Sequence, residues 1–138
     1  MSTSSTTVFF ASEAGQVLSH SDGYAVLRYR PVRRQPGELA LLLSKAGQLL
    51  QLFGWHRMLA DNRELTPFTE EEKEWFQAEW IENRSGYRPA PLHVAIVQPQ
   101  DVFARLSVLE LVNSAAGHSV HYSTFAGEAA AVAHLRQL

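Results

Sequence analysis

Residues 92–98, LHVAIVQ, make an almost continuous apolar run of strand length. A run of this kind is expected of a central strand that is covered by helices on both of its faces. The segment RMLADN at 57–62 is predicted to be a shorter, buried strand before it, and SVHYSTF at 119–125 a strand after it. We therefore predict an interior strand at 92–98 that is flanked by the strand at 57–62.

Four helices are predicted around these strands, at residues 38–53, 69–84, 102–117 and 127–138. In the first of them, apolar residues recur three and four positions apart, and Gly54 stands where a C-terminal glycine is expected. In the second, Thr69 and Glu72 have the spacing of a capping box. The segment VFARLSVLELVNSAAG, residues 102–117, is interpreted as an amphipathic helix that ends at its glycine.

The first thirty residues predict an antiparallel meander of three strands, TVFFASE, QVLSH and YAVLRYR, with the Asp-Gly signal of a tight hairpin at 21–23. Pro31 and Pro36 end the meander, because proline cannot donate to a strand ladder. Beyond them, helix and strand alternate, which calls for right-handed crossovers and parallel strands. The predicted class is α/β, with a mixed, largely parallel sheet, an antiparallel N-terminal meander and four helices.

Length and composition predict a single globular domain over residues 1–138, with residues 1–6 flexible. The chain is 46% hydrophobic and 19% charged, which is ordinary for a globular protein. Twelve basic and fourteen acidic residues give a formal charge of −2, so no strong positive field attracts nucleic acid. The absence of cysteine excludes thiol nucleophiles, disulfides and cysteine-ligated metals. No nucleic-acid partner is predicted.

The N-terminal segment MSTSSTTVFF lacks the basic flank and sustained apolar region of a secretory signal. The longest apolar stretches are interrupted by Ser44, Lys45 and Gln48 and are too short for a transmembrane segment. We therefore expect a cytoplasmic protein without a transmembrane segment.

Four segments resemble the SpoIIAA-like family, part of the wider STAS group: MLADNREL with its Asp-x-Arg, EEKEWFQAEW, VAIVQPQDVFARL and HYSTFAGEAAAVAHL. The resemblance covers nearly the whole chain. It implies a small cytosolic α/β domain that acts by binding and has no established reaction. Some relatives of that fold bind lipid or other apolar ligands.

One motif departs from the STAS switch proteins, which carry Asp-Ser-Ser-Gly with a phosphorylated serine at the start of a helix. The corresponding junction here reads NRELTPFTEEE, and its only hydroxyls are those of Thr66 and Thr69. Because Thr69 is explained by its capping role, a phosphoswitch of that type is not predicted.

The end of the strand at 57–62 carries the charged pair Asp61 and Arg63. Residues two apart on a strand point to the same side, and binding sites of parallel sheets lie at strand carboxyl ends. The two side chains either pair with each other or grip a ligand, or Asp61 accepts backbone amides in the turn while Arg63 holds the next helix. With Phe68 and Thr69, the two charged residues form the predicted recognition surface.

The helix that leaves this surface carries Trp75, Phe76, Trp80 and Ile81, which spread around it instead of forming one stripe. Part of this set is expected in the core. The remainder, with Trp75 and Trp80 as candidates, is predicted to form an exposed aromatic surface for a second subunit or an apolar ligand. A homodimer interface on this helix is one of the two possibilities.

A local basic cluster, RYRPVRR, follows the meander and contains Arg28, Arg30, Arg33 and Arg34. It either contacts phosphate groups or an acidic partner, or it is the solvated end of a strand. Both interpretations are open at the level of sequence.

No motif for a known catalytic or metal centre is present. His118 and His121 lie an odd number of positions apart in a predicted strand, so their side chains face opposite ways and cannot share an ion. His93 is predicted to be a hydrogen-bonded core residue. No G-x-S-x-G elbow, H-E-x-x-H pair or phosphate-binding glycine loop occurs. We therefore expect no enzyme activity, no cofactor and no metal.

Two functions fit these features of the sequence. The leading one is a protein-interaction domain in regulation or signalling, whose protein partner is unknown. The alternative is a binder or carrier of lipid or another small apolar molecule. They differ in the interior, because a carrier needs an apolar pocket of about 300 Å³ or more, whereas an interaction domain has a filled core.

Overall fold

The computed structural model describes residues 5–138 of the chain. Residues 1–4, most of the segment predicted to be flexible, lie outside the described residues, and Thr6 already begins the first strand. None of the helices formed by residues 5–138 is long and apolar enough to cross a membrane.

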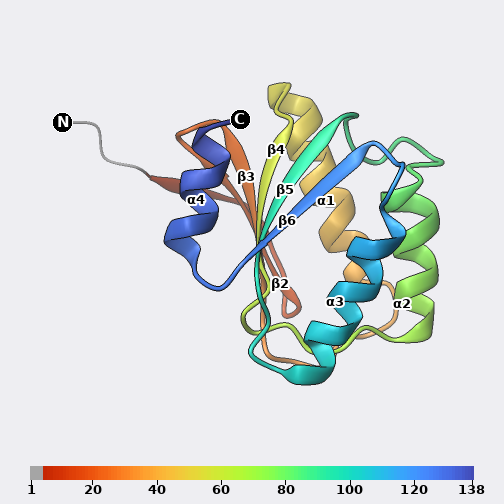
Figure 1. Cartoon of the computed structure of the whole chain (residues 1–138). Helices are drawn as coiled ribbons and strands as arrows, with labels where there is room; N and C mark the ends of the chain where they lie inside the picture. The colour runs from red at the N-terminus through yellow and green to blue at the C-terminus, as the bar shows by residue number, and fades with distance from the viewer. Residues whose placement is uncertain (1–4) are drawn as a thin grey trace.

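A six-stranded sheet runs through the molecule in the order in which its strands occur along the chain (Figure 1). Its strands are β1 (Thr6–Ala11), β2 (Gly15–His20), β3 (Tyr24–Tyr29), β4 (Arg57–Asp61), β5 (Leu92–Val97) and β6 (Val120–Phe125). The β1–β2 and β2–β3 pairs are antiparallel, and the remaining three pairs are parallel. The predicted α/β class, with an antiparallel meander and a largely parallel remainder, is confirmed.

Helices cover both faces of the sheet. They are α1 (Glu38–Phe53), α2 (Glu70–Trp75), η1 (Phe76–Ile81), α3 (Val102–Ser114) and α4 (Glu128–Arg136). In Figure 1, α1, α2 and α3 lie on one face and α4 on the other. The strand β5 is an interior strand flanked by β4, as predicted, and β6 pairs with its other side. Its alternate side chains enter two separate cores. Val94 packs on the side of α1, and Ala95 packs against α4.

The helix predicted at 69–84 ends at Ile81 and changes its winding halfway. Its second half, η1, is a π-helix, in which the Glu82 amide donates to the Gln77 carbonyl five residues earlier at 2.9 Å. This wider winding brings residues four and five apart onto one side, so Phe76, Trp80 and Ile81 all enter the core. The prediction of Trp80 as part of an exposed aromatic surface is wrong, because its exposed fraction is 0%.

The C-terminal end of η1 is closed by Arg88, a buried arginine whose side chain bonds to backbone carbonyls. Its guanidinium donates to the carbonyls of Trp80 and Ile81 and, through Nη2 at 3.1 Å, to Ser119 Oγ. Burial lowers the pKa of Arg88. No carboxylate of residues 5–138 forms an ion pair with it, so this arginine acts as a helix cap, since it satisfies carbonyls that the helix leaves open.

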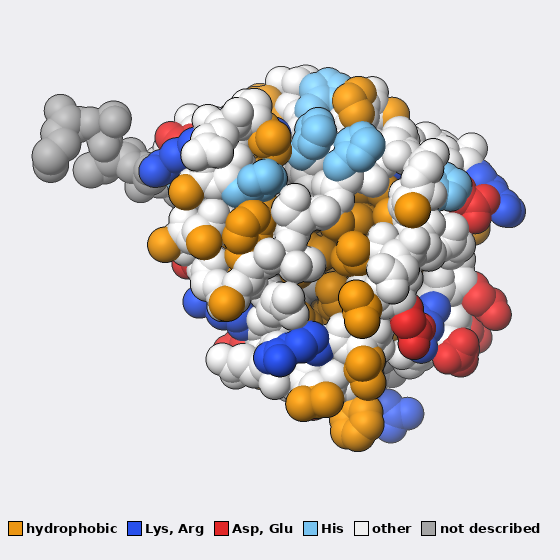
Figure 2. Space-filling model, in the orientation of Figure 1, with side chains coloured by type: hydrophobic (Ala, Val, Ile, Leu, Met, Phe, Trp, Pro, Cys, Tyr) orange, Lys and Arg blue, Asp and Glu red, His pale blue; other side chains and the backbone are white. Residues whose placement is uncertain are grey.

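The helix predicted at 102–117 differs from its prediction in length and in character. It ends at Ser114, and its inner face, which includes Val108 and Leu111, is buried. Its outer face is also apolar: Val102, Phe103, Leu106 and Leu109 are 54–70% exposed. The expectation of an amphipathic helix was wrong, because apolar residues occupy both sides of α3. Figure 2 shows hydrophobic side chains gathered at the lower edge of the molecule, where Figure 1 draws the start of this helix.

Candidate partner-binding groove

The structure distributes the predicted site residues over several places. Arg33, Arg34, Thr69 and Trp75 line one groove. Arg28, Asp61 and Arg63 line a second hollow. Phe68 and Trp80 are buried in the core, and Arg30 is exposed at the end of β3. The predicted rim of Asp61, Arg63, Phe68 and Thr69 is therefore not one continuous surface.

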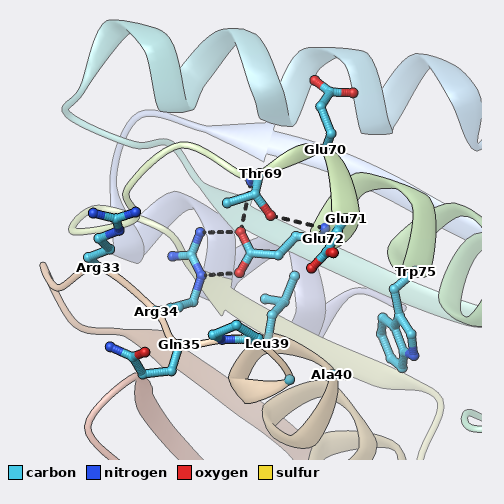
Figure 3. A pocket seen from close by; sticks show the side chains of 12 residues that line it. Arg33, Arg34, Gln35, Leu39, Ala40, Thr69, Glu70, Glu71, Glu72 and Trp75 are labelled. Atoms are coloured by element: carbon cyan, nitrogen blue, oxygen red, sulfur yellow. Dashed lines mark hydrogen bonds and ion pairs between the residues drawn. The ribbon is translucent and has the colours of Figure 1, made fainter.

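The groove has a volume of about 720 Å³ and lies between the start of α1 and the start of α2. We call it the α1–α2 groove; it is lined by residues 33–37, Leu39, Ala40, residues 69–72 and Trp75. Figure 3 shows Arg33 and Trp75 at opposite ends of the groove, with the first turn of α1 between them. Residues from two distant parts of the chain therefore build its two sides.

The floor of the groove is the ion pair between Arg34 and Glu72 (Figure 3). Arg34 Nε donates to Glu72 Oε2 at 2.7 Å, and Nη2 donates to Oε1 at 3.0 Å. Its Nη1 donates to Thr66 Oγ1 at 3.0 Å, and its carbon Cζ lies 5.5 Å from the ring centroid of Phe68. A bidentate, stacked guanidinium is held in one geometry. The floor is therefore rigid.

Thr69 and Glu72 form the predicted capping box of α2, which is confirmed. Thr69 Oγ1 accepts from the Glu72 amide at 3.1 Å, and Glu72 Oε1 accepts from the Thr69 amide at 2.8 Å. Burial would raise the pKa of Glu72, but hydrogen bonds from Arg34 and Thr69 and the charge of Arg34 outweigh it, so the pKa is lowered. The carboxylate of Glu72 thus serves the cap and the floor together.

Two side chains of the groove, Arg33 and Trp75, are at least partly accessible to a binding partner. Arg33 is exposed, and its guanidinium has no hydrogen bond or ion pair with residues 5–138. Trp75 is half-buried, with its ring centroid 5.5 Å from that of Tyr87. The N-cap of α1 is Gly37, which has no side chain to accept from the first amides of that helix. The groove therefore offers a cation, an aromatic surface and a helix start.

The hollow at Asp61 is a network of paired charges at the carboxyl ends of β3 and β4. Asp61 Oδ2 accepts from Arg63 Nη2 at 2.8 Å and from Arg28 Nε at 3.3 Å. Asp61 Oδ1 also accepts from the backbone amide of Arg63 at 3.3 Å. Both arginines reach Glu128 in the first turn of α4. Asp61 thus anchors its own turn, and Arg63 contacts α4 instead of the next helix.

The prediction of His93 as a hydrogen-bonded core residue is wrong, because its side chain is only half-buried on β5 and stacks on another histidine. His118 lies in the turn before β6, and His121 lies on β6 opposite His93 of β5. The rings of His93 and His121 stack with centroids 5.1 Å apart, and the His93 ring makes no hydrogen bond within residues 5–138. In this part of the chain, no group of three or more His, Cys, Asp or Glu side chains is placed to hold a metal ion.

A small cavity in the core was not foreseen from the sequence. It has a volume of about 30 Å³ and lies among apolar side chains of the sheet, η1 and α3. Three of its lining groups have no hydrogen-bond partner among residues 5–138: Asn62 Oδ1, Trp80 Nε1 and Tyr122 Oη. Burial raises the pKa of Tyr122. The cavity has room for ordered water, which needs about 10–15 Å³ of such space.

Protein-family models, curated proteins and solved structures all give no match to this chain. The groove, the charged hollow and the core cavity therefore carry the case for function.

We expect the domain to lose stability as the pH falls below about 4. For both Asp61 and Glu72, burial alone would raise the pKa, but hydrogen bonds and arginine charges have the larger effect. The pKa of each carboxyl is therefore lowered in the folded protein. A lowered folded pKa stabilises the domain above the unfolded pKa of about 4, and this contribution is lost as the pH falls through the folded value. Urea unfolding at a series of pH values measures this loss.

The matched variants for this pH experiment are Glu72→Gln and Glu71→Gln. Glutamine at position 72 keeps a capping-box acceptor but does not titrate, so the fall of stability with acid should be shallower. Glu71 is exposed, and its replacement should leave the wild-type profile unchanged. Equal acid slopes in the wild type and Glu72→Gln would contradict the assignment to Glu72.

Proposed function

We propose that this chain is a non-enzymatic protein-interaction domain of the STAS or SpoIIAA-like type, acting in regulation or signalling. It binds an extended segment of a partner protein in the α1–α2 groove. The observation that carries this proposal is the groove itself, about 720 Å³ in volume, with Arg33 at one end and Trp75 at the other. The six-stranded mixed sheet with four helices is compatible with that family.

The side chains of the groove suggest the chemistry of the bound segment. Arg33 favours an acidic side chain, because its guanidinium has no carboxylate within residues 5–138. Trp75 favours an aromatic or aliphatic side chain, since a half-buried tryptophan at an interface supplies much of the binding energy. Leu39 and Ala40 add apolar contacts between them. A peptide segment with an acidic residue near Arg33 and an apolar residue near Trp75 therefore fits the groove.

The charges of the groove favour binding over catalysis. A general base at neutral pH needs a pKa near 7. The lowered pKa of Glu72 makes its carboxylate a poor base, and its two oxygens are already occupied by Arg34 and the Thr69 amide. The same holds at the hollow, where Asp61 is paired with two arginines and its pKa is lowered.

A carrier of lipid or another apolar ligand is the second candidate, and the core cavity is the observation that bears on it. Its volume of about 30 Å³ is roughly one tenth of the volume that a ligand of drug size needs. Loading a lipid would require the helices to separate from the sheet. The filled core therefore favours the interaction domain. Native mass spectrometry of the purified protein, followed by extraction, checks for bound lipid.

The groove is tested with an unbiased library of displayed peptides. We expect selection to enrich peptides that combine acidic and apolar residues. Trp75→Ala should weaken binding of the selected peptides by at least about tenfold, and Arg33→Glu by about three- to tenfold at low salt, with both variants folded at the assay temperature. Arg33 is exposed, so its replacement should leave the melting temperature almost unchanged. Trp75 also packs against the core, so its replacement should lower the melting temperature, and its binding is compared below that temperature.

The matched controls are Phe53→Ala and Arg30→Glu, an exposed aromatic and an exposed arginine outside the groove. They should bind the peptides like the wild type. A selection without enrichment, or equal binding by all four variants, would refute the assignment of the groove.

A further inference from the structure

The outer face of α3, made by Val102, Phe103, Leu106 and Leu109, is an apolar surface separate from the α1–α2 groove. Its four side chains expose on the order of 400 Å² of apolar area, comparable with the largest patch of a typical monomer. A standard interface buries about 800 Å² on each partner, of which slightly more than half is apolar. The face is therefore about as large as the apolar part of a dimer interface.

The spacing of this face is that of a coiled-coil helix. Val102, Leu106, Leu109 and Asn113 follow one another at intervals of four, three and four residues, and all four are exposed. This is the alternation of d and a positions in a heptad repeat. Leu106 and Asn113 then occupy a positions. Asparagine at an a position is a known determinant of register in two-stranded parallel coiled coils.

The charges beside the face fit a parallel pair. In this heptad register, Arg105 occupies a g position, and Glu110 occupies the e position of the next heptad. In a parallel coiled coil, a g residue faces the e residue five positions further along in the partner. Both side chains are exposed. Within the domain, Glu110 Oε2 lies 3.3 Å from Lys73 Nζ, and Arg105 donates to the Pro99 carbonyl through Nε and Nη2. Two symmetric Arg105–Glu110 pairs would therefore form between two copies.

The remaining heptad positions already serve the domain itself. Ala104, Ser107, Val108 and Leu111, at the b, c and f positions, are buried against the rest of the domain. The folded domain thus presents its a, d and e positions and the g position of Arg105 to solvent on a preformed helix, whereas Val112, at the next g position, is half-buried against the core. Short isolated coiled coils are unstable because nucleating their helices is unfavourable. Here the helix is already formed in each copy before two copies meet.

We propose that two copies of this chain associate through the outer faces of α3, with the two helices parallel about a two-fold axis. The occupant of the face is a second copy, because the exposed heptad pattern is complementary to itself in both its apolar and its charged positions. This interface goes beyond the proposed function and leaves the α1–α2 groove of each copy available.

The first experiment measures molar mass by light scattering and sedimentation over a range of micromolar concentrations. The wild type should be a dimer at the upper end. Leu106→Lys should raise the dimer dissociation constant at least about 100-fold. The fold should survive, since Leu106 is 54% exposed. The control Leu52→Lys, at a leucine that is 67% exposed on α1, should leave the dimer intact. A monomeric wild type overturns the proposal, as does a dimer that Leu106→Lys leaves intact.

The orientation is tested by charge exchange. Arg105→Glu and Glu110→Arg should each weaken the dimer by about tenfold, because each creates two like-charge contacts. The double exchange restores opposite charges and should recover affinity close to that of the wild type. Recovery identifies the partner as a second copy in parallel register. Two weakened single variants without recovery in the double variant overturn the parallel arrangement.

Covalent capture provides an independent test, because the chain contains no cysteine. In the parallel pair, the two Asn113 positions face each other across the axis, so Asn113→Cys should form a disulfide-linked dimer on mild oxidation. Ser85→Cys, at an exposed position outside α3, is the matched control and should remain monomeric on a denaturing gel. Equal cross-linking of both variants, or of neither, counts against the interface. A purified protein whose α3 face is covered by a different protein also counts against it.

Discussion

Replacing Arg88 with leucine should lower the free energy of unfolding by about 3 kcal/mol or more. The side chain of Arg88 is buried and donates to the carbonyls of Trp80 and Ile81 and to a third carbonyl at Pro89. Leucine leaves these acceptors buried without donors, and each such group costs about 1–3 kcal/mol. Removal of a buried charge offsets part of this loss.

The π-helix explains why the effect should be concentrated at this position. The last carbonyls of any helix lack partners within the helix, and those of η1 are held by the planar fork of Arg88. Lysine has a single charged nitrogen, so Arg88→Lys should recover only a small part of the stability. Urea denaturation followed by circular dichroism measures both variants.

The matched control is Arg84→Leu, because Arg84 is in the same loop but its side chain is 65% exposed and pairs with Glu82. Its replacement should change stability by less than about 0.5 kcal/mol. Equal effects of Arg84→Leu and Arg88→Leu would show that the carbonyl contacts contribute little.

The second large effect is expected at the floor of the α1–α2 groove. Arg34→Met should destabilise the domain by about 3–5 kcal/mol, because it leaves the carboxylate of Glu72 partly buried without its partner. It also removes donors from the carbonyls of Thr66 and Pro67. Peptide binding in the groove should fall with the stability, since the floor no longer holds α2 against the segment before α1.

A second substitution separates the unpaired charge from the lost packing. Glu72→Gln combined with Arg34→Met removes the lone carboxylate but keeps an acceptor for the capping box. The double variant should therefore be more stable than Arg34→Met alone by about 1–2 kcal/mol. The exposed neighbour Arg33→Ala is the control and should be within about 0.5 kcal/mol of the wild type. A double variant less stable than Arg34→Met would contradict this explanation.

Local patterns in the sequence determined the architecture. The order of the elements, the interior strand at 92–98, the hairpin at 21–23, the capping box of Thr69 and the C-terminal Gly54 all occur as predicted. These features depend on side-chain periodicity and on hydrogen bonds between residues a few positions apart. Such information is contained in a short window of sequence, and tertiary contacts here reinforce it.

The candidate site was predicted only in pieces. The sequence placed Asp61 and Arg63 on the same side of a strand end, with pairing as one of several possibilities, but the contact of Arg63 with Glu128 depends on how α4 crosses the sheet. Arg34 and Glu72 lie 38 positions apart, and no local pattern predicts their bidentate contact. A basic cluster in sequence was therefore divided by the fold, with Arg28 in the hollow and Arg34 in the groove floor.

Burial was the property that only the tertiary structure decided. Phe68 and Trp80 are of residue types common in recognition surfaces, but both are buried in the core. The π-helix places Phe76, Trp80 and Ile81 on one side, which faces the core. Conversely, α3 is apolar on both faces, so its sequence does not indicate which face meets the sheet. The sequence by itself determined which segments form strands and helices, because those preferences are local. Which side chains are left for a partner was decided by packing, because burial depends on neighbours that are distant in the chain.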